Sequence, residues 1–163
     1  MLHRGKQLYV FLFVNEHFAV LIGTGADSDT PLVRLHSQCI TGDILGSLKC
    51  DCGDQLQAAM RLMADTGGGV LVYLAQEGRD IGLLNKMRAY ALQDNGLDTV
   101  DANHALGFDT DERLFLPAAR ILQALNITKI QLIPNNPDKI SQLEQHGVNV
   151  TKRVPLALAT NPH

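Results

Sequence analysis

The three cysteines of the chain all lie between positions 39 and 52, within the stretch CITGDILGSLKCDC. Cys50 and Cys52 are two residues apart, so in an extended segment their side chains leave the same face of the backbone. The turn-prone residues TGDILGS would bring Cys39 back toward them. Because soft thiolates favour zinc over magnesium or calcium, the spacing predicts a zinc ion with three sulfur ligands. Water would take the fourth position, as is typical of catalytic zinc.

Two other interpretations of the cysteines stay open at this point. A single buried cysteine usually behaves as a small hydrophobic residue, although three at this spacing weaken that interpretation. His36 could also be a fourth ligand, which would close the site for a structural role. If VRLHSQC is extended, however, Arg34, His36 and Gln38 share one face and Cys39 lies on the other. That geometry argues against His36 as a ligand.

The charge of such a site limits its chemistry. Three thiolates on a divalent ion leave a net charge of about −1, so bound water is less acidic than on three neutral histidines. The site therefore needs a nearby acid or base. Cysteine-rich zinc deaminases nevertheless attack electron-poor ring carbons, and a purine carbon is a target of this kind.

Four cations are candidates for binding a polyanion: Arg34, Arg79, Arg113 and Lys139. The segment QEGRDIGLLNK places Glu77 and Arg79 in a glycine-containing loop between a strand and a helix, where backbone N–H groups favour anions. Lys139 falls in the first turn of another helix, where a cation is unfavourable unless an anion neutralises it. These positions indicate a phosphate-bearing ligand. For each cation taken singly, a solvated surface position is the alternative.

The segment DTDERLF allows two interpretations. Asp109, Thr110 or Asp111 could cap a helix, with Arg113 pairing locally. Asp111 and Arg113 could instead form a catalytic pair, and the spacing alone does not decide between the two.

The elements that would position these residues follow from the pattern of apolar residues. Strand-length apolar stretches occupy residues 7–14, 18–23, 31–36, 69–74, 129–133 and 148–154. Helices are expected over residues 54–67, 82–96, 114–126 and 135–147. In the second helix, Leu84, Met87 and Ala91 form the expected apolar stripe. We therefore expect one α/β domain over residues 1–163, with mixed α+β order and a mixed sheet packed by helices.

Composition excludes several classes of function. A net charge of −3 and a pI near 6.0 argue against a protein that binds nucleic acid by neutralising phosphates. No apolar run is long enough to span a bilayer, and the first residues lack a signal-peptide cleavage site. Three cysteines cannot all pair within one chain, which favours a reducing compartment. We expect a cytoplasmic protein without a nucleic-acid or membrane partner.

Several motifs together resemble the GTP cyclohydrolase II family, zinc enzymes that open the guanine ring of GTP at the start of riboflavin synthesis. The motifs are VRLHSQCITGD, GSLKCDCGDQL, QEGRDIGLLNKMRAYALQDNGLDTVDANHALGF, DER and NNPDKI, in the order and spacing of that family. The resemblance covers roughly residues 31–155.

The resemblance implies a homodimer that binds GTP with Mg²⁺ on the phosphates. Cys39, Cys50 and Cys52 would hold a zinc ion that activates water for attack at C8, with loss of formate. Arg113 would attack the α-phosphate and Asp111 would accept its proton, releasing pyrophosphate. The product would be 2,5-diamino-6-(5-phosphoribosylamino)pyrimidin-4-one.

The resemblance also assigns residues to the substrate. The implied contacts with GTP are Arg34, Leu35, His36, Ser37, Gln38, Gln55, Glu77, Gly78, Arg79, Thr99, Pro134 and Lys139. Tyr90 would stand near the ring-opening chemistry, although its place on a helix also fits core packing.

Two positions depart from the family pattern. Gln38 stands where the family usually has Glu, and Pro134, where it has Thr, removes a hydroxyl and a backbone donor. Three hypotheses follow. The chain is a GTP cyclohydrolase II, a divergent homologue that acts on another purine nucleotide or stops at the formylated intermediate, or a non-catalytic zinc-stabilised nucleotide-binding module.

Overall fold

The apolar segment GGVLVYL forms β4 (Gly68–Leu74) inside a six-stranded sheet, where both of its faces are covered. The computed structural model describes residues 6–133 and 138–156. The strand order is β1-β2-β4-β3-β5-β6. β4 pairs antiparallel with β2 (Glu16–Gly23) and parallel with β3 (Leu32–Ser37). The sheet is therefore mixed, as expected.

The outer strands complete this sheet. β5 (Lys129–Ile133) runs parallel to β3, and β6 (Asn149–Arg153) runs parallel to β5. At the opposite edge, β1 (Lys6–Leu12) pairs antiparallel with β2. The predicted strands are confirmed, and each end lies within two residues of its predicted position.

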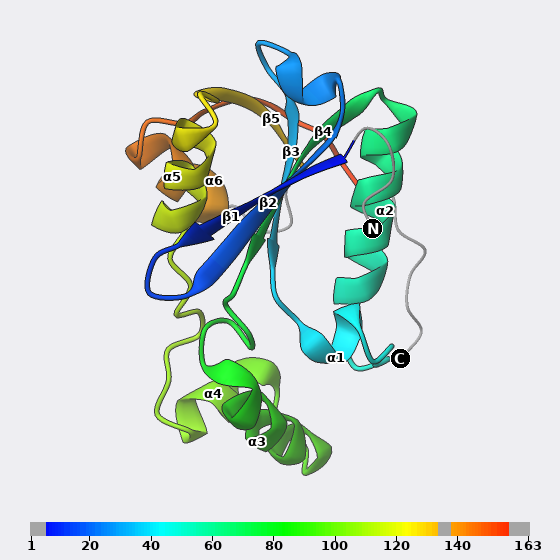
Figure 1. Ribbon diagram of the computed structural model, residues 1–163. Helices are drawn as coiled ribbons and strands as arrows, with labels where there is room; N and C mark the ends of the chain where they lie inside the picture. Colours follow the sequence, from blue (N-terminus) through cyan, green and yellow to red (C-terminus); the bar gives the residue numbers. More distant parts are fainter. Residues whose placement is uncertain (1–5, 134–137, 157–163) are drawn as a thin grey trace.

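Helices cover both faces of the sheet (Figure 1). α2 (Cys52–Asp65) lies on one face, where Ala59 and Met63 pack against the sheet. α5 (Leu116–Ala124) and α6 (Asp138–Gln145) lie on the other. None of the helices within the described ranges has the length and apolar character that crossing a bilayer requires.

A third group of helices lies beyond one end of the sheet in Figure 1. It comprises the short α1 (Ile40–Asp43), α3 (Gly82–Asp94) and α4 (Thr99–Ala105). β3 leads through α1 into α2 on one face, whereas β4 leads through α3 and α4 into α5 on the other face. Strands whose connections leave to opposite faces form a crevice at their carboxyl ends, which is where α/β proteins bind ligands.

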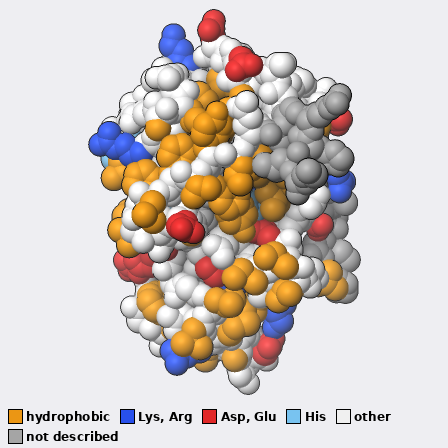
Figure 2. Space-filling model, viewed as in Figure 1, with side chains coloured by type: hydrophobic (Ala, Val, Ile, Leu, Met, Phe, Trp, Pro, Cys, Tyr) orange, Lys and Arg blue, Asp and Glu red, His pale blue; other side chains and the backbone are white. Residues whose placement is uncertain are grey.

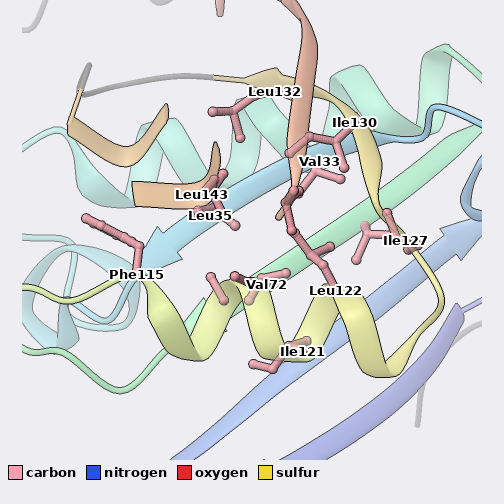
Figure 3. Close-up of a cluster of buried hydrophobic side chains, with 14 of the residues drawn as sticks. Val33, Leu35, Val72, Phe115, Ile121, Leu122, Ile127, Ile130, Leu132 and Leu143 are labelled. Carbon is pink, nitrogen blue, oxygen red and sulfur yellow. The ribbon is translucent and has the colours of Figure 1, made fainter. Parts of the chain in front are cut away.

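The larger hydrophobic core lies between the sheet and α5. Leu122 of α5 points toward the sheet residues Val33 and Val72 in Figure 3. Along β3, Val33 and Leu35 face this core, while Arg34 faces α2 and hydrogen bonds to Gln55 there. The alternation expected from the sequence is therefore confirmed on β3.

The apolar stripe expected on α3 is wrong. Leu84, Met87 and Ala91 are exposed, whereas Lys86 and Ala89 are buried. α3 does not cover the sheet. Its buried side faces the residues that follow β3 and β4, where Lys86 bonds to Cys39 and Glu77. Helical spacing alone could not show which face would meet a neighbour.

Two further differences concern helix ends. α4 escaped prediction because it is short and polar, although Asp98 caps it by accepting hydrogen bonds from the N–H groups of Val100 and Asp101 at 2.8 and 2.9 Å. α5 begins at Leu116 without a side-chain cap, so the capping role considered for Asp109, Thr110 or Asp111 is wrong. The expected local pairing of Arg113 is confirmed.

Replacing Leu122 by Ala should lower the free energy of unfolding by about 2–5 kcal/mol, because it leaves a cavity in the closed core. Urea denaturation followed by circular dichroism measures this loss. Leu116→Ala in the first turn of the same helix is the matched control, because its side chain is 39% exposed. The control should cost less than about 1 kcal/mol, and equal losses would contradict this description of the core.

Candidate active site and metal centre

The three cysteine sulfurs converge at the carboxyl end of β3. Cys39 follows this strand and is the N-cap of α1, Cys50 lies in the loop before α2, and Cys52 is the first residue of α2. The sulfur atoms all lie within 4.8 Å of one another, and those of Cys39 and Cys50 are 3.5 Å apart. Cys52 is thus helical, and the extended segment expected around Cys50 and Cys52 is wrong at this residue.

This arrangement fits a zinc ion. Zn–S bonds of about 2.3 Å in a tetrahedral site require sulfur atoms about 3.8 Å apart, and the sulfurs of Cys39 and Cys50 lie 3.5 Å apart. Gly42 makes room for them, since a Cβ there would lie 2.8 Å from the sulfur of Cys50 and 3.2 Å from that of Cys39. Within residues 6–133 and 138–156, no His, Asp or Glu joins the group, so three ligands leave one position open.

Hydrogen bonding also prepares the sulfurs for a cation. The pKa of the Cys39 thiol is lowered to about 4, chiefly by a hydrogen bond from Cys52 and also by one from Lys86. The pKa of Cys52 is raised because its proton is shared with Cys39 and its side chain is buried. Among these sulfurs Cys39 is therefore the one whose thiolate is favoured, and a divalent ion would displace the remaining protons.

Asp43 holds α1 against the sheet. Its carboxylate bonds to Nε2 of His36 at 3.0 Å, to the hydroxyl of Tyr73 at 2.7 Å and to the backbone N–H of Cys39 at 3.0 Å. Burial alone raises the pKa of Asp43, but these donors outweigh burial and the pKa lies below its ordinary value. His36 is therefore bonded to Asp43 rather than grouped with the sulfurs, which agrees with the argument against it as a zinc ligand.

Lys86 and Glu77 form a second support for Cys39. Nζ of Lys86 donates to the sulfur of Cys39 at 2.9 Å and to Oε1 of Glu77 at 2.7 Å. Burial alone lowers the pKa of Lys86, but these two partners outweigh it and the pKa lies above its ordinary value. Lys86 was not among the predicted site residues. The apolar stripe expected on this helix, Leu84, Met87 and Ala91, placed Lys86 on the solvent side, and no local pattern in the sequence indicated that it would be buried.

A cavity of about 620 Å³ adjoins the sulfurs. Its volume falls within the range of small-molecule sites. The predicted site residues that line it are Ser37, Gln38, Cys39, Cys50, Cys52, Gln55, Gly78, Arg79, Tyr90, Thr99, Asp111 and Arg113. The fold thus brings together residues from four separate motifs.

The other predicted residues lie behind this wall or outside it. Leu35 packs in the hydrophobic core, and its carbonyl accepts a hydrogen bond from Nζ of Lys139 at 3.0 Å. Arg34 is buried and donates to Oε1 of Gln55 at 2.6 Å. Oε2 of Glu77 accepts from the N–H of Ile40 at 2.7 Å. Pro134 falls outside the described residues, so its predicted contact is not addressed by the structure.

Asp111 and Arg113 form a two-pronged ion pair at the cavity. Nε of Arg113 donates to Oδ1 of Asp111 at 2.7 Å, and a terminal nitrogen donates to Oδ2. Burial alone raises the pKa of Asp111, but Arg113 outweighs burial and the pKa lies below its ordinary value. Asp111 therefore remains an acceptor at neutral pH.

A left-handed turn holds the loop that carries this pair. Gly78, Arg79 and Asp80 have φ angles of 63°, 62° and 74°, an arrangement that costs free energy for residues other than glycine. NH1 of Arg79 donates to the carbonyl of Thr110 at 2.9 Å, and the N–H of Glu112 donates to the carbonyl of Arg79 at 3.3 Å. The strained turn after β4 thereby fixes the Asp111 loop.

Two of the cations beside the cavity, Arg34 and Lys139, are buried. Burial lowers the pKa of Arg34 to about 10, and its Nε has no hydrogen-bond partner among the described residues. Burial, followed by the charges of Arg34 and Arg113, lowers the pKa of Lys139 well below its ordinary value. An anionic ligand nearby would favour the charged forms of both side chains.

Tyr90 belongs to the cavity rather than to the hydrophobic core. Its ring lies beneath two ammonium groups, Nζ of Lys49 at 5.4 Å and Nζ of Lys86 at 5.8 Å from the ring centroid. Burial raises the pKa of Tyr90, so its hydroxyl keeps its proton at neutral pH. The core-packing alternative for this residue is therefore not supported.

Comparisons with a family model and with individual proteins indicate the same family. A sequence model described as GTP cyclohydrolase II matches residues 6–155, so the similarity begins earlier than residue 31. Proteins named GTP cyclohydrolase-2 are similar over about 90% of this chain: 53% identity in Azospirillum brasilense, 56% in Azotobacter vinelandii and 51% in Klebsiella pneumoniae. The chain spans 38%, 71% and 74% of the lengths of these relatives, respectively.

Gly42→Ala should weaken zinc binding by about tenfold or more, because its methyl group would push the sulfurs of Cys39 and Cys50 apart. Competition with a chromogenic chelator measures this affinity. Ile44→Ala, an exposed change at the end of the same short helix, is the control and should leave the affinity unchanged. Wild-type affinity in Gly42→Ala would contradict the close packing of the sulfurs.

Asp43→Asn should lower the free energy of unfolding at neutral pH by about 1–3 kcal/mol, since three buried donors lose their carboxylate. The folded-state pKa is lowered, so this stability is present above the unfolded pKa and is lost as the pH falls through the folded value. Urea denaturation over a pH series should show the difference between wild type and Asp43→Asn shrinking below pH 3.8, the ordinary Asp value.

Asp54→Asn is the control for this carboxylate, because Asp54 is exposed in the first turn of α2. It should cost no more than about 1 kcal/mol. A difference between wild type and Asp43→Asn that stayed constant into acid would refute the role given to Asp43.

Proposed function

Because this chain belongs to the GTP cyclohydrolase II family, we propose that it hydrolyses GTP, opening the imidazole ring at C8 with release of formate and pyrophosphate. Its place would be in riboflavin synthesis, with the diaminopyrimidinone as product. The observation that carries the proposal is one cavity lined by both the three sulfurs and the Asp111–Arg113 pair. A single nucleotide could place its base beside the three sulfurs and its phosphates beside the Asp111–Arg113 pair.

The metal side of the reaction rests on Cys39, Cys50 and Cys52. A zinc ion bound there would supply Lewis acidity and lower the pKa of water at its open position. The chain itself contributes a protonated Tyr90 hydroxyl in the same cavity, able to donate a hydrogen bond to the ring or to water. Cys39 is held at two atoms: its backbone N–H donates to Asp43, and its sulfur accepts a hydrogen bond from Lys86.

The phosphate side rests on the cations. Arg79 and Arg113 line the cavity, and Arg34 and Lys139 interact with its lining residues from behind. Guanidinium groups match phosphate oxygens in two-pronged geometry. Mg²⁺ would neutralise the remaining phosphate charge. Arg113 would attack the α-phosphate, so that a nitrogen–phosphorus bond forms as the bond to the leaving pyrophosphate breaks, and Asp111, an acceptor already bonded to this arginine, would take the proton that Arg113 loses. Water would then hydrolyse the nitrogen–phosphorus bond and return Arg113 to its starting state.

A divergent activity is the second candidate. Gln38 lines the cavity with a neutral amide where the family usually has a carboxylate. An amide can donate as well as accept, so it could accommodate another purine or alter the fate of a formylated intermediate. A nucleotide-binding module without turnover is the third candidate, and the assay of formate release described below also tests it.

We further propose a homodimer in a reducing compartment such as the cytoplasm. Figure 2 shows hydrophobic side chains on the face where β1 and β2 lie in front, and Leu8, Val10 and Leu12 of the edge strand β1 are exposed. Covering such an edge is a common reason for association. Free cysteines that must hold a metal require reducing conditions. The net charge of −3 gives no reason to expect nucleic acid as a partner.

Zinc-loaded protein incubated with GTP and Mg²⁺ should release formate and pyrophosphate. Asp111→Asn should reduce kcat by about 100-fold or more, because the proton acceptor is lost. Asp109→Asn, an exposed position in the same loop, is the matched control and should retain the wild-type rate.

The absence of formate at every GTP concentration would overturn the proposal. Mass spectrometry of the nucleotide then separates the alternatives: a formylated product or a modified second purine supports divergence, and unchanged nucleotides support the non-catalytic module.

A further inference from the structure

A buried ion pair supports the sulfur cluster from α3. Lys86 is 8% exposed and Glu77 is 9% exposed, and both lie beside Cys39, which is 3% exposed. The ammonium bonds to the carboxylate at 2.7 Å and to the cysteine sulfur at 2.9 Å. The three groups therefore form a continuous chain of charge-assisted hydrogen bonds that ends on a sulfur of the metal site.

Stability of the fold does not account for this pair. A buried ion pair generally contributes little net stability, because the desolvation of both charges offsets their attraction. α3 also turns its apolar residues Leu84 and Met87 outward while it buries Lys86. The helix thus leaves apolar side chains exposed and buries a lysine whose ammonium group bonds to a sulfur atom.

The bond changes what the sulfur can give to a metal. An N–H donor draws electron density from a thiolate, so the ligand donates less charge and the ion remains a stronger Lewis acid. This effect alone would weaken the sulfur–metal bond, and the gain in affinity comes from holding the sulfur in position. Three thiolates around a divalent ion carry a net charge of about −1, and the ammonium of Lys86 offsets it. The positive charge of Lys86 would therefore counter the low acidity of bound water that three thiolate ligands would otherwise cause.

Glu77 positions both partners in this bond. Oε1 holds the ammonium of Lys86, while Oε2 accepts the N–H of Ile40, the residue that follows Cys39. The carboxylate therefore fixes the donor and the backbone of the acceptor at once. Rigid outer partners of this kind orient metal ligands and raise affinity.

We propose that Lys86, held by Glu77, is a positioning residue of the metal centre that strengthens divalent-metal binding and reduces electron donation from Cys39. This inference deepens the proposed function and rests on it only through the metal site. Its test accordingly uses metal ions alone, without GTP.

The test compares Lys86→Met with the wild-type full chain. Methionine keeps an unbranched side chain but has no N–H donor and no charge. Zinc competition with a chelator should show an affinity about tenfold or more weaker. With cobalt(II) as the probe, the sulfur-to-metal charge-transfer band should move to longer wavelength, because the sulfur of Cys39 becomes more electron-rich.

Lys49→Met is the matched control. Nζ of Lys49 also lies over the Tyr90 ring, but its ion pair is with Asp94 at the surface. The control should leave both the zinc affinity and the cobalt band unchanged. Lys86→Arg, which retains a charged donor, should return both readouts toward wild type.

If Lys86→Met does not fold, Glu77→Gln provides the same test with the ammonium retained. It should shift both readouts in the same direction by a smaller amount. Folded Lys86→Met, or failing that folded Glu77→Gln, with wild-type zinc affinity and an unmoved cobalt band would overturn the inference.

The outcome is separable from that of the proposed reaction. A wild-type chain that binds neither zinc nor cobalt would overturn the metal site and this inference together. A chain that shows the Lys86 effect but releases no formate from GTP would overturn the reaction alone.

Discussion

The close approach of three sulfur atoms is the constraint on which the rest of the site depends. Three thiolates at this distance would repel one another when a metal binds, so the backbone that carries them must be held in place. Asp43 does this for Cys39 by bonding to its N–H and to side chains of the sheet, and Gly42 leaves the space that the sulfurs occupy. The short helix α1 is therefore stabilised by its contacts with the sheet more than by its own hydrogen bonds.

The sheet brings distant parts of the sequence to this point. Connections from β3 and β4 leave toward opposite faces, so the carboxyl ends of both strands open into one cavity. The turn at Gly78–Asp80 then joins the end of β4 to the loop that carries Asp111 and Arg113. Backbone strain in that turn is compensated by these bonds, and strained turns of this kind often mark functional sites.

The sequence contained enough information for the strands and for the composition of the site, because alternation of apolar residues and clustering of cysteines are local signals. It could not show that Cys52 would begin a helix or that α3 would bury Lys86. Both depend on which face of an element meets a partner remote in the sequence. The role of Asp43 was equally hidden, since its donors His36 and Tyr73 come from two different strands.

The outward-facing apolar side of α3 has a consequence for how the site is closed. α3 and α4 pack chiefly against each other rather than against the sheet, and Lys86 ties this pair to Cys39. The two helices therefore act as a cap whose fastening point is a metal ligand. A metal ion bound at the sulfurs would therefore also favour order in α3 and α4, because one of its ligands would be bonded to Lys86 of this pair.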